Sequence, residues 1–152
     1  MDLHRLEPGR PCRLGGVTIP SDMGPRGHSD GDAVLHAICD AVLGAAGLDD
    51  LGSLFPDGDR ANEGRDSAEF CAEALRLAAR KGLKLLSLDV VVEAERPRIR
   101  PHRPAIRSRL SELFEVPIDR VNVKGKTGEG LGAIGRGEAL RATAVVLLGP
   151  RT

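Results

Sequence analysis

The chain has 152 residues, and its 22 Lys and Arg balance its 22 Asp and Glu, so the formal net charge is zero. A balanced charge argues against nucleic acid as the main partner, because phosphate backbones bind surfaces with a basic excess. The absence of Trp and Tyr, with only three Phe, predicts an aliphatic core without stacking surfaces for bases, and no apolar run approaches the roughly 20 residues of a membrane span.

The first half of the chain predicts one strand and one long helix. Residues 12–20, CRLGGVTIP, indicate a short strand, and the glycines and prolines of residues 21–27 indicate a loop. We expect a helix from Ser29 or Asp30 to about Gly47, because apolar residues recur there at helical spacing. These apolar residues are Val34, Leu35, Ile38, Val42 and Leu43. The turn residues of LFPDGDRANEGR, residues 54–65, predict a long polar loop.

The second half predicts alternating helices and strands. The sequence DSAE at residues 66–69 is a capping box that begins a helix ending at Lys81 and Gly82. Valines in residues 88–94 indicate a strand, and Pro104 begins a third helix. We expect this third helix to end at about residue 115. It is followed by a strand over 120–126, a glycine-rich loop over 127–138 and a final strand over 140–149, whose Ala and Leu also suit a helix.

This order of elements favours the α+β class, a two-layer sandwich in which one mixed sheet carries helices on one face. The length suits a single domain, residues 1–152. The other sheet face would need a cover, which an oligomer built around the sheets would provide. Cys12, Cys39 and Cys71 form no Cys-x-x-Cys motif and no signal peptide is evident, so we expect buried thiols in a reduced, cytoplasmic protein.

Three residues of the first half could hold a metal ion. Asp2 and His4 would share a face if their segment is extended, since side chains alternate along a strand. His36 lies on the first predicted helix, where Asp32, His36 and Asp40 are four residues apart and form one polar ridge. A solvated helix face is the simpler interpretation of that ridge. Together, Asp2, His4 and His36 match the three protein ligands of a catalytic zinc site with an open fourth position.

The sequence HSDGD at residues 28–32 has two compatible interpretations. Ser29 or Asp30 can cap the helix that follows. The free N–H groups at a helix start also attract anions, and His28 at that entrance could donate to a phosphate. Further along, FPDGD at residues 55–59 has the chemistry of a turn, and Asp50 lies just after the first helix.

Two nucleotide-binding motifs fail in the glycine-rich segment KGKTGEGLGAIGRGE. Gly130, Gly132 and Gly135 fit G-x-G-x-x-G after a strand, but no helical pattern follows, and the acidic residue expected about 20 residues later would fall at or beyond the C-terminus. The tripeptide GKT at 125–127 resembles the end of a P-loop, but Arg120 occupies the position of the required earlier glycine. The segment could still wrap a phosphate with backbone N–H groups, and a plain surface loop is equally compatible.

Motifs along nearly the whole chain resemble one known family. They are DLH, HSDGDAVLHAICDAVLGAAGLDDLGSLFPDGD, VNVKGKTGEGLG and GRGE, in this order. They resemble the 2-C-methyl-D-erythritol 2,4-cyclodiphosphate synthase family of non-mevalonate isoprenoid biosynthesis, and the HSDGD-x-x-x-H block followed by FPD-x-D is highly specific. The resemblance implies a phosphorus–oxygen lyase that acts as a homotrimer, with active sites between neighbouring subunits.

The resemblance also implies the reaction and its metal ions. The substrate is a cytidine diphosphate ester, 4-diphosphocytidyl-2-C-methyl-D-erythritol 2-phosphate, whose 2-phosphate attacks the β-phosphate. CMP leaves, and 2-C-methyl-D-erythritol 2,4-cyclodiphosphate forms. A divalent ion, usually zinc, is held by Asp2, His4 and His36. A second ion, Mg²⁺ or Mn²⁺, lies on the diphosphate with help from Glu129.

Individual roles follow from the same resemblance. His28 and Thr127 are the catalytic residues that hold and polarise the reacting phosphates, and Ser29 joins His28 at the erythritol phosphate. Residues 55–59 form a mobile substrate loop, and residues 94–100 and 126–129 bind cytidine and its phosphates, largely through backbone. The implied substrate-binding set is Asp2, His4, His28, Ser29, Asp50, Leu51, Gly52, Phe55, Pro56, Asp57, Gly58, Asp59, Ala94, Glu95, Arg96, Pro97, Arg98, Ile99, Arg100, Lys126, Thr127, Gly128, Glu129, Ala133 and Arg136, and Arg136 with Glu138 would line the trimer axis.

The chain departs from the family pattern in several places. Lys126 stands where the family usually has Thr, Ala133 where an aromatic residue is common, and Arg98 where a lysine is usual. A lysine beside the diphosphate adds a point charge that changes its binding. Only Met1 precedes Asp2, so we expect a shortened first strand in which Asp2 lacks ladder partners and zinc binds less tightly.

Two alternatives to the synthase remain compatible with the sequence. One is a metal-dependent phosphohydrolase that uses the same site, with water in place of the internal phosphate. The other is a non-catalytic trimeric binding protein of the same fold. The products formed from the cytidine diphosphate ester separate the three possibilities.

Overall fold

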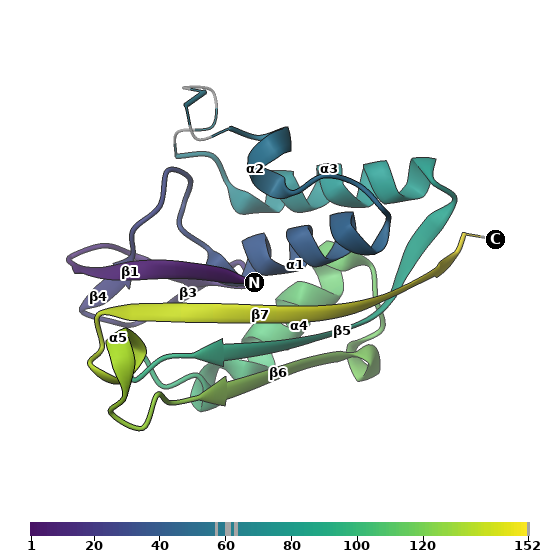
Figure 1. Ribbon diagram of the computed structural model, residues 1–152. Coiled ribbons are helices and arrows are strands. Elements are labelled where there is room, and N and C mark those ends of the chain that lie inside the picture. The colour runs from purple at the N-terminus through teal and green to yellow at the C-terminus, as the bar shows by residue number, and fades with distance from the viewer. Residues whose placement is uncertain (57, 60–61, 63, 152) are drawn as a thin grey trace.

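The computed structural model describes residues 1–56, 58–59, 62 and 64–151 (Figure 1). Its strands are β1 (Asp2–Pro8), β2 (Cys12–Leu14), β3 (Val17–Ile19), β4 (Met23–Pro25), β5 (Leu83–Glu93), β6 (Val121–Lys126) and β7 (Ala139–Pro150). Its helices are α1 (Ala33–Ala45), α2 (Leu51–Leu54), α3 (Ser67–Arg80), α4 (Arg103–Phe114) and α5 (Gly132–Gly135), with the 3-10 turns η2 (Arg100–His102) and η3 (Ile118–Arg120).

The main sheet is mixed, as the sequence predicts. Its strand order is β4-β1-β7-β5-β6, and a separate hairpin joins β2 and β3. Neighbouring strands of the main sheet are antiparallel except β5 and β6, which are parallel and are connected through α4. Strand β1 therefore lies inside the sheet, with β7 on one side and β4 on the other. Its position matters because β1 carries two of the candidate metal ligands.

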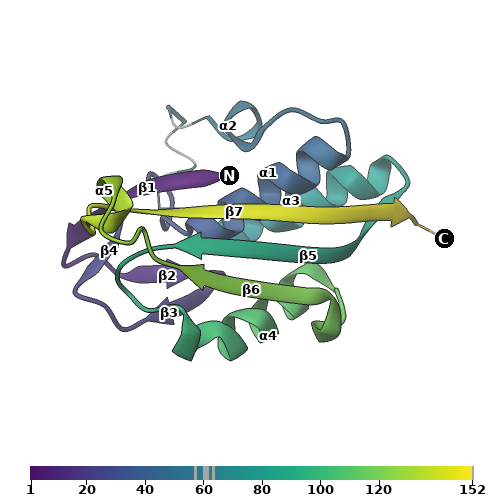
Figure 2. The same cartoon turned by 60° about the horizontal axis from the view of Figure 1, so that its bottom comes forward.

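Helices α1, α3 and α4 cover one face of the sheet and complete the two-layer α+β fold (Figures 1 and 2). The core between the layers is aliphatic, and Phe114 is the one aromatic residue among the largest fully buried side chains. Cys12, Cys39 and Cys71 are buried and free, as expected, and the cytoplasmic location stays a prediction. Among the described residues, no helix has the length and apolar character needed to cross a membrane.

The opposite face of the sheet carries exposed apolar side chains. On β7, Val145 and Leu147 are 67% and 57% exposed, and Leu3 of β1 is 58% exposed. Arg141 and Glu93 form an ion pair across β7 and β5, with Arg141 on the same side of β7 as Val145. Large exposed apolar patches often mark interaction surfaces. The face is consistent with the expected oligomer, which stays a prediction.

Three local predictions for the first half are wrong. Residues 12–20 form the hairpin of β2 and β3 rather than one strand, because Gly15 and Gly16 turn the chain with φ of 64° and 76°. The predicted loop at residues 21–27 contains β4, which pairs with β1. Helix α1 begins at Ala33 and is capped by Asp32, not by Ser29 or Asp30.

Asp32 holds both the hairpin turn and the start of α1. Its carboxylate is fully buried and accepts hydrogen bonds from the backbone N–H groups of Gly15, Gly16 and Leu35. Burial raises the pKa of Asp32 above its usual value, although these three N–H groups oppose the shift. The ridge predicted from Asp32, His36 and Asp40 is therefore not a solvated face.

The other elements largely match the prediction. Helix α3 ends at Arg80, helix α4 begins with Pro104 in its first turn, and β7 is a strand rather than a helix. The short helices α2 and α5 were not predicted. The expectation that Asp2 lacks ladder partners is wrong, because Asp2 pairs in register with Ala142 of β7 and its neighbours continue that ladder.

Candidate active site

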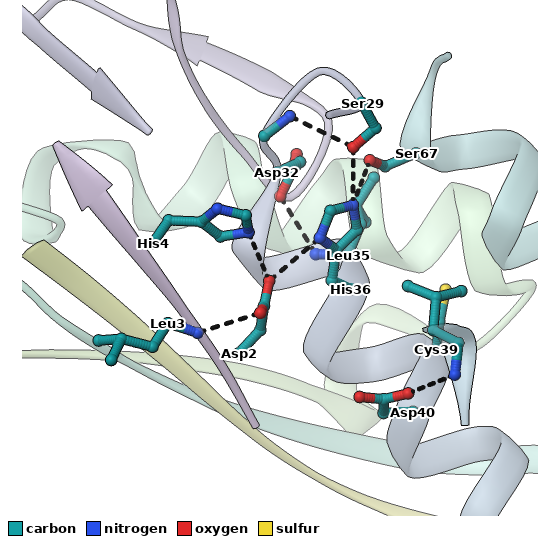
Figure 3. Close-up of polar contacts among 12 residues, drawn as sticks. Asp2, Leu3, His4, Ser29, Asp32, Leu35, His36, Cys39, Asp40 and Ser67 are labelled. Carbon is teal, nitrogen blue, oxygen red and sulfur yellow. Dashed lines mark hydrogen bonds and ion pairs between the residues drawn. The ribbon is translucent and has the colours of Figure 1, made fainter. Parts of the chain in front are cut away.

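Strand β1 and helix α1 bring the three candidate metal ligands together (Figure 3). Asp2 and His4 lie two residues apart on β1, and His36 lies in the first turn of α1. One ligand atom from each residue lies within 4.8 Å of the other two. The triad that the sequence predicts is therefore assembled within one chain.

Hydrogen bonds fix the orientation of both histidine rings. His4 Nε2 lies 2.7 Å from Asp2 Oδ2, and His4 Nδ1 lies 2.5 Å from the backbone carbonyl oxygen of Arg26. A carbonyl oxygen only accepts, so His4 Nδ1 carries a proton and donates it. His36 Nδ1 lies 3.0 Å from the same oxygen of Asp2. The nitrogens that face Asp2 are thus Nε2 of His4 and Nδ1 of His36.

Asp2 and His4 stabilise each other's charged form. Burial would raise the pKa of Asp2, but hydrogen bonds from His36 and His4 outweigh it and hold that pKa well below its usual range. Burial would lower the pKa of His4, but its bond to the Asp2 carboxylate raises that pKa overall. In the metal-free chain, Asp2 is therefore ionised, and its negative charge favours a positive charge next to it.

The donor set fits a divalent ion of the zinc type. Two imidazole nitrogens and a carboxylate oxygen are ligands that zinc prefers, and three protein ligands leave a position open. Histidines that bind metals usually donate their other N–H to an oxygen acceptor, and His4 donates to the Arg26 carbonyl in this way. The residues present are therefore suited to hold such an ion.

The triad lies in the wall of a cavity of about 580 Å³. This cavity gathers several predicted site residues from the first half of the chain: Asp2, His4, His28, Ser29, His36, Leu51, Gly52 and Phe55. Sequence reasoning missed other lining residues: Arg10, Arg26, Gly27, Asp40, Asn62 and Phe70. Arg10 and Arg26 belong to no motif. Arg10 follows the end of β1, and the pairing of β1 with β4 places the backbone carbonyl of Arg26 beside His4.

Helix α2 forms one rim of this cavity. The predicted site residue Asp50 caps α2 by accepting the N–H of Ser53 at 2.7 Å. Asp40 of α1 accepts the N–H of Leu51 at 2.8 Å. These two bonds attach α2 to α1 and keep Leu51 and Gly52 at the edge of the cavity.

The predicted substrate loop begins with an aromatic contact. The rings of Phe55 and Phe70 lie 4.6 Å apart between centroids, and the guanidinium group of Arg65 lies 5.4 Å from each centroid. This contact anchors the start of the loop to α3. Of the other predicted loop residues, Pro56, Gly58 and Asp59 are described, and Asp57 lies outside the described residues.

The remaining predicted site residues lie elsewhere on the chain. Part of the segment 94–100 lines a second cavity, of about 640 Å³. Glu95 ties this segment to the glycine-rich loop by accepting the N–H of Gly128 at 2.9 Å. In that loop, the Thr127 hydroxyl donates to Glu129 at 2.5 Å. Within the described part of one chain, neither segment lines the cavity of the metal triad.

The glycine-rich loop is compact because its backbone folds on itself. A Cβ at Gly135 would lie 2.2 Å from the carbonyl carbon of Gly130, so only glycine fits there. Close packing thus explains Gly135, and positive φ angles of 75° and 63° explain Gly130 and Gly132, without a dinucleotide motif. Lys126 and Ala133 are exposed, and Arg136 forms an exposed ion pair with Glu138 at 2.9 Å.

The fold and the site define an α+β domain that presents two histidines and an aspartate at the edge of a polar cavity. A model of the YgbB family matches residues 1–149. The chain belongs to this family, and curated relatives at 44–50% identity carry the name 2-C-methyl-D-erythritol 2,4-cyclodiphosphate synthase, a phosphorus–oxygen lyase. The resemblance seen in the sequence is confirmed.

Individual relatives are similar over nearly their full lengths. A protein of Gemmatimonas aurantiaca with this name is 50% identical over 148 residues, which cover 96% of this chain and 89% of that protein. A solved synthase in a CDP-bound form is 48% identical with a TM-score of 0.90, and the match covers 97% of this chain and 96% of that one. The CDP complex of IspF from Plasmodium falciparum is 34% identical with a TM-score of 0.86, covering 99% and 93%.

Proposed function

We propose that the chain catalyses the reaction of its family. It converts 4-diphosphocytidyl-2-C-methyl-D-erythritol 2-phosphate to 2-C-methyl-D-erythritol 2,4-cyclodiphosphate with release of CMP, in non-mevalonate isoprenoid biosynthesis. Family membership and relatives at 50% identity support this activity. The structural observation that carries it is the convergence of Asp2, His4 and His36 beside a cavity large enough for a phosphorylated ligand.

The first cavity suits the phosphorylated erythritol part of the substrate. Phosphoryl transfer depends mainly on positioning and charge stabilisation, and His28 and Ser29 place polar groups in the wall. Arg10 and Arg26 add positive charge nearby. A zinc ion on the triad would act as a Lewis acid toward a phosphate oxygen. The roles of these residues remain part of the proposal.

The second cavity suits the cytidine part. Residues 95–98 line it, and Glu95 ties them to the loop with Thr127 and Glu129. We assign residues 94–100 to cytidine and residues 126–129 to the diphosphate. We assign Glu129 to a second ion, Mg²⁺ or Mn²⁺, because hard cations prefer oxygen ligands.

A homotrimer would complete each site. The metal triad lines the first cavity, and the Thr127 loop does not reach that cavity within the described part of one chain. The proposed reaction needs the triad and this loop on one diphosphate. A neighbouring copy can supply the missing half through a heterologous interface that closes into a ring. The exposed Leu3, Val145 and Leu147 offer an apolar surface for such an interface.

Product analysis tests the proposal directly. The full chain is incubated with the cytidine diphosphate ester, zinc and magnesium, and the products are separated by chromatography and phosphorus NMR. We expect the cyclic diphosphate and CMP in equal amounts, and neither from His36→Ala. Inorganic phosphate would instead indicate the phosphohydrolase, and unchanged but bound substrate would indicate the non-catalytic binding protein.

A further inference from the structure

His36 has a buried contact on the side away from Asp2 that the proposed reaction does not use (Figure 3). Its Nε2 lies 2.9 Å from the hydroxyl oxygen of Ser67, the first residue of α3. The Ser29 hydroxyl oxygen also lies 3.0 Å from this nitrogen. Ser67 is fully buried and does not line the cavity, so a contact with substrate does not explain it.

A carboxylate decides the direction of the Ser67 hydroxyl. Ser67 Oγ lies 2.5 Å from Asp30 Oδ1, and the Ser67 N–H lies 3.3 Å from Oδ2 of the same residue. Asp30 also pairs with Arg13 at 3.3 Å, and its side chain is only 10% exposed. An ionised carboxylate can only accept hydrogen bonds. The hydroxyl proton of Ser67 therefore points at Asp30.

The Ser67 oxygen then offers only lone pairs to His36. It must accept, so a proton stays on His36 Nε2. In the metal-free chain, Nδ1 donates to the Asp2 carboxylate, and a metal ion held by Asp2 would take the place of that Nδ1 proton. Ser29 has a different place in the network, because its hydroxyl has no carboxylate partner among the described residues and it lines the cavity. Ser67, and not Ser29, thus specifies the tautomer.

We propose that Ser67 and Asp30, with Arg13 behind them, form a relay that positions His36 as a metal ligand. This inference rests on the proposed metal site and deepens it. His4 receives the same support from the backbone carbonyl of Arg26, which no side-chain substitution removes. His36 depends on side chains from α3 and from the loop before α1, so its orientation can be altered without touching a ligand.

Ser67→Ala tests the relay through metal binding. In a chelator competition on the full chain, zinc affinity should fall about 10- to 100-fold, as is typical when an outer partner of a metal ligand is removed. In the zinc-loaded protein, NMR should show that the Nε2 proton of His36 exchanges faster with water than in the wild type. The Nδ1 proton of His4 should not change, because its acceptor is intact.

Glu73→Ala is the control for damage to α3. Glu73 accepts a hydrogen bond from Arg76 Nε at 2.6 Å on the same helix, so its loss should lower the Tm slightly but leave zinc affinity unchanged. Ser67→Thr keeps the hydroxyl and should retain most of the affinity. Unchanged affinity and exchange in Ser67→Ala, or an equal loss in Glu73→Ala, would overturn the relay. A wild-type chain that binds no zinc would instead overturn the metal site itself.

Discussion

The two histidines of HSDGDAVLH, His28 and His36, differ in what their rings face. The Nδ1 atom of His36 faces Asp2, and its Nε2 atom is hydrogen-bonded to Ser67. His28 lines the cavity and is not a member of the ligand triad. Substitutions at the two positions should therefore have separable effects on metal content and on rate.

His36→Ala should abolish bound zinc and, with it, turnover, because one of three ligands is lost. His28→Ala should keep its zinc and lose about 100- to 1,000-fold in kcat, since it would remove a group that stabilises charge on phosphate. Elemental analysis and steady-state kinetics on both variants measure these effects. One zinc per chain in His36→Ala would show that the ligand assignment is wrong.

The pKa shifts of the triad predict how the metal-free protein responds to pH. The pKa of folded Asp2 lies below the ordinary 3.8, so Asp2 contributes stability above that value and loses it as the pH falls further. The pKa of folded His4 lies above the ordinary 6.5, so His4 contributes stability below that value and loses it as the pH rises through its folded pKa. The pair therefore stabilises most between about pH 4 and pH 6.5.

Thermal unfolding of the wild type and of Asp2→Asn, both with excess chelator, checks this. The Tm advantage of the wild type should shrink as the pH is raised above about 6.5, because the proton on His4 is then lost. His102→Ala serves as a control for general histidine effects, because His102 lines the second cavity and not the one with the triad. An advantage that does not change with pH would contradict the assigned coupling.

At the scale of elements, the site depends on where β1 and α1 are anchored. Strand β1 pairs with β7 through residues 2–5, which include both ligands, and with β4 through residues 6–8. Helix α1 is buried along most of its length, and Asp32 joins its first turn to the β2–β3 hairpin. The ligands thus sit on elements whose positions are set by the core rather than by a metal.

Asp32→Ala should destabilise the chain by about 3 kcal/mol, because three backbone N–H groups, two of them buried, lose their acceptor. Asp50→Ala removes a cap from the exposed helix α2 and should cost clearly less than Asp32→Ala. Urea unfolding of the two variants measures both losses. Equal small losses would mean that Asp32 does not hold the hairpin to the helix.

Metal removal should leave the fold intact. In domains that fold around a metal, binding energy and folding energy are the same, whereas here the ligands sit on a paired strand and a buried helix. We expect the far-ultraviolet circular dichroism to be unchanged after dialysis against a chelator, with Tm rising on zinc addition by linkage. Loss of helical signal on chelation would contradict the independent anchoring of β1 and α1.

At the scale of the whole molecule, the main feature is the distance between the metal triad and the proposed diphosphate loop. The triad lines the first cavity, whereas the Thr127 loop is bonded to Glu95 of the second cavity's wall, and an apolar sheet face stays exposed. If each site is shared by two neighbouring chains, two inactive variants with defects in different halves of the site should regain activity when mixed.

Mixing His36→Ala with Thr127→Ala subunits should restore activity that neither variant has alone. With random exchange of equal amounts, about a quarter of the interfaces would pair two intact halves. Activity assays after subunit exchange, together with light scattering, measure this. A monomer in solution, or mixtures with no recovery after proven exchange, would count against shared sites.

Much of this organisation could be predicted from the sequence, for identifiable reasons. The spacing of Asp2 and His4 needed only an extended segment to place both on one face, and the HSDGD block placed His36 on a helix. The start of α1 could not be predicted, because Asp32 becomes the cap through contacts with a distant segment. Its carboxylate is buried against the Gly15–Gly16 turn and accepts hydrogen bonds from it. Ser67 was missed because a capping box explains its position without reference to His36.

The scarcity of aromatic residues affects how the protein absorbs ultraviolet light. The chain has no Trp or Tyr, and of its three Phe, Phe114 and Phe70 are buried in the core, with Phe55 in tilted contact with Phe70 beside the first cavity. Phenylalanine absorbs only weakly in the near ultraviolet, so in a nucleotide complex the cytosine ring would be the dominant chromophore. Once free nucleotide is separated by gel filtration, the amount of cytidine nucleotide bound could therefore be read from the absorbance of the base itself, without a label and with almost no background from the protein.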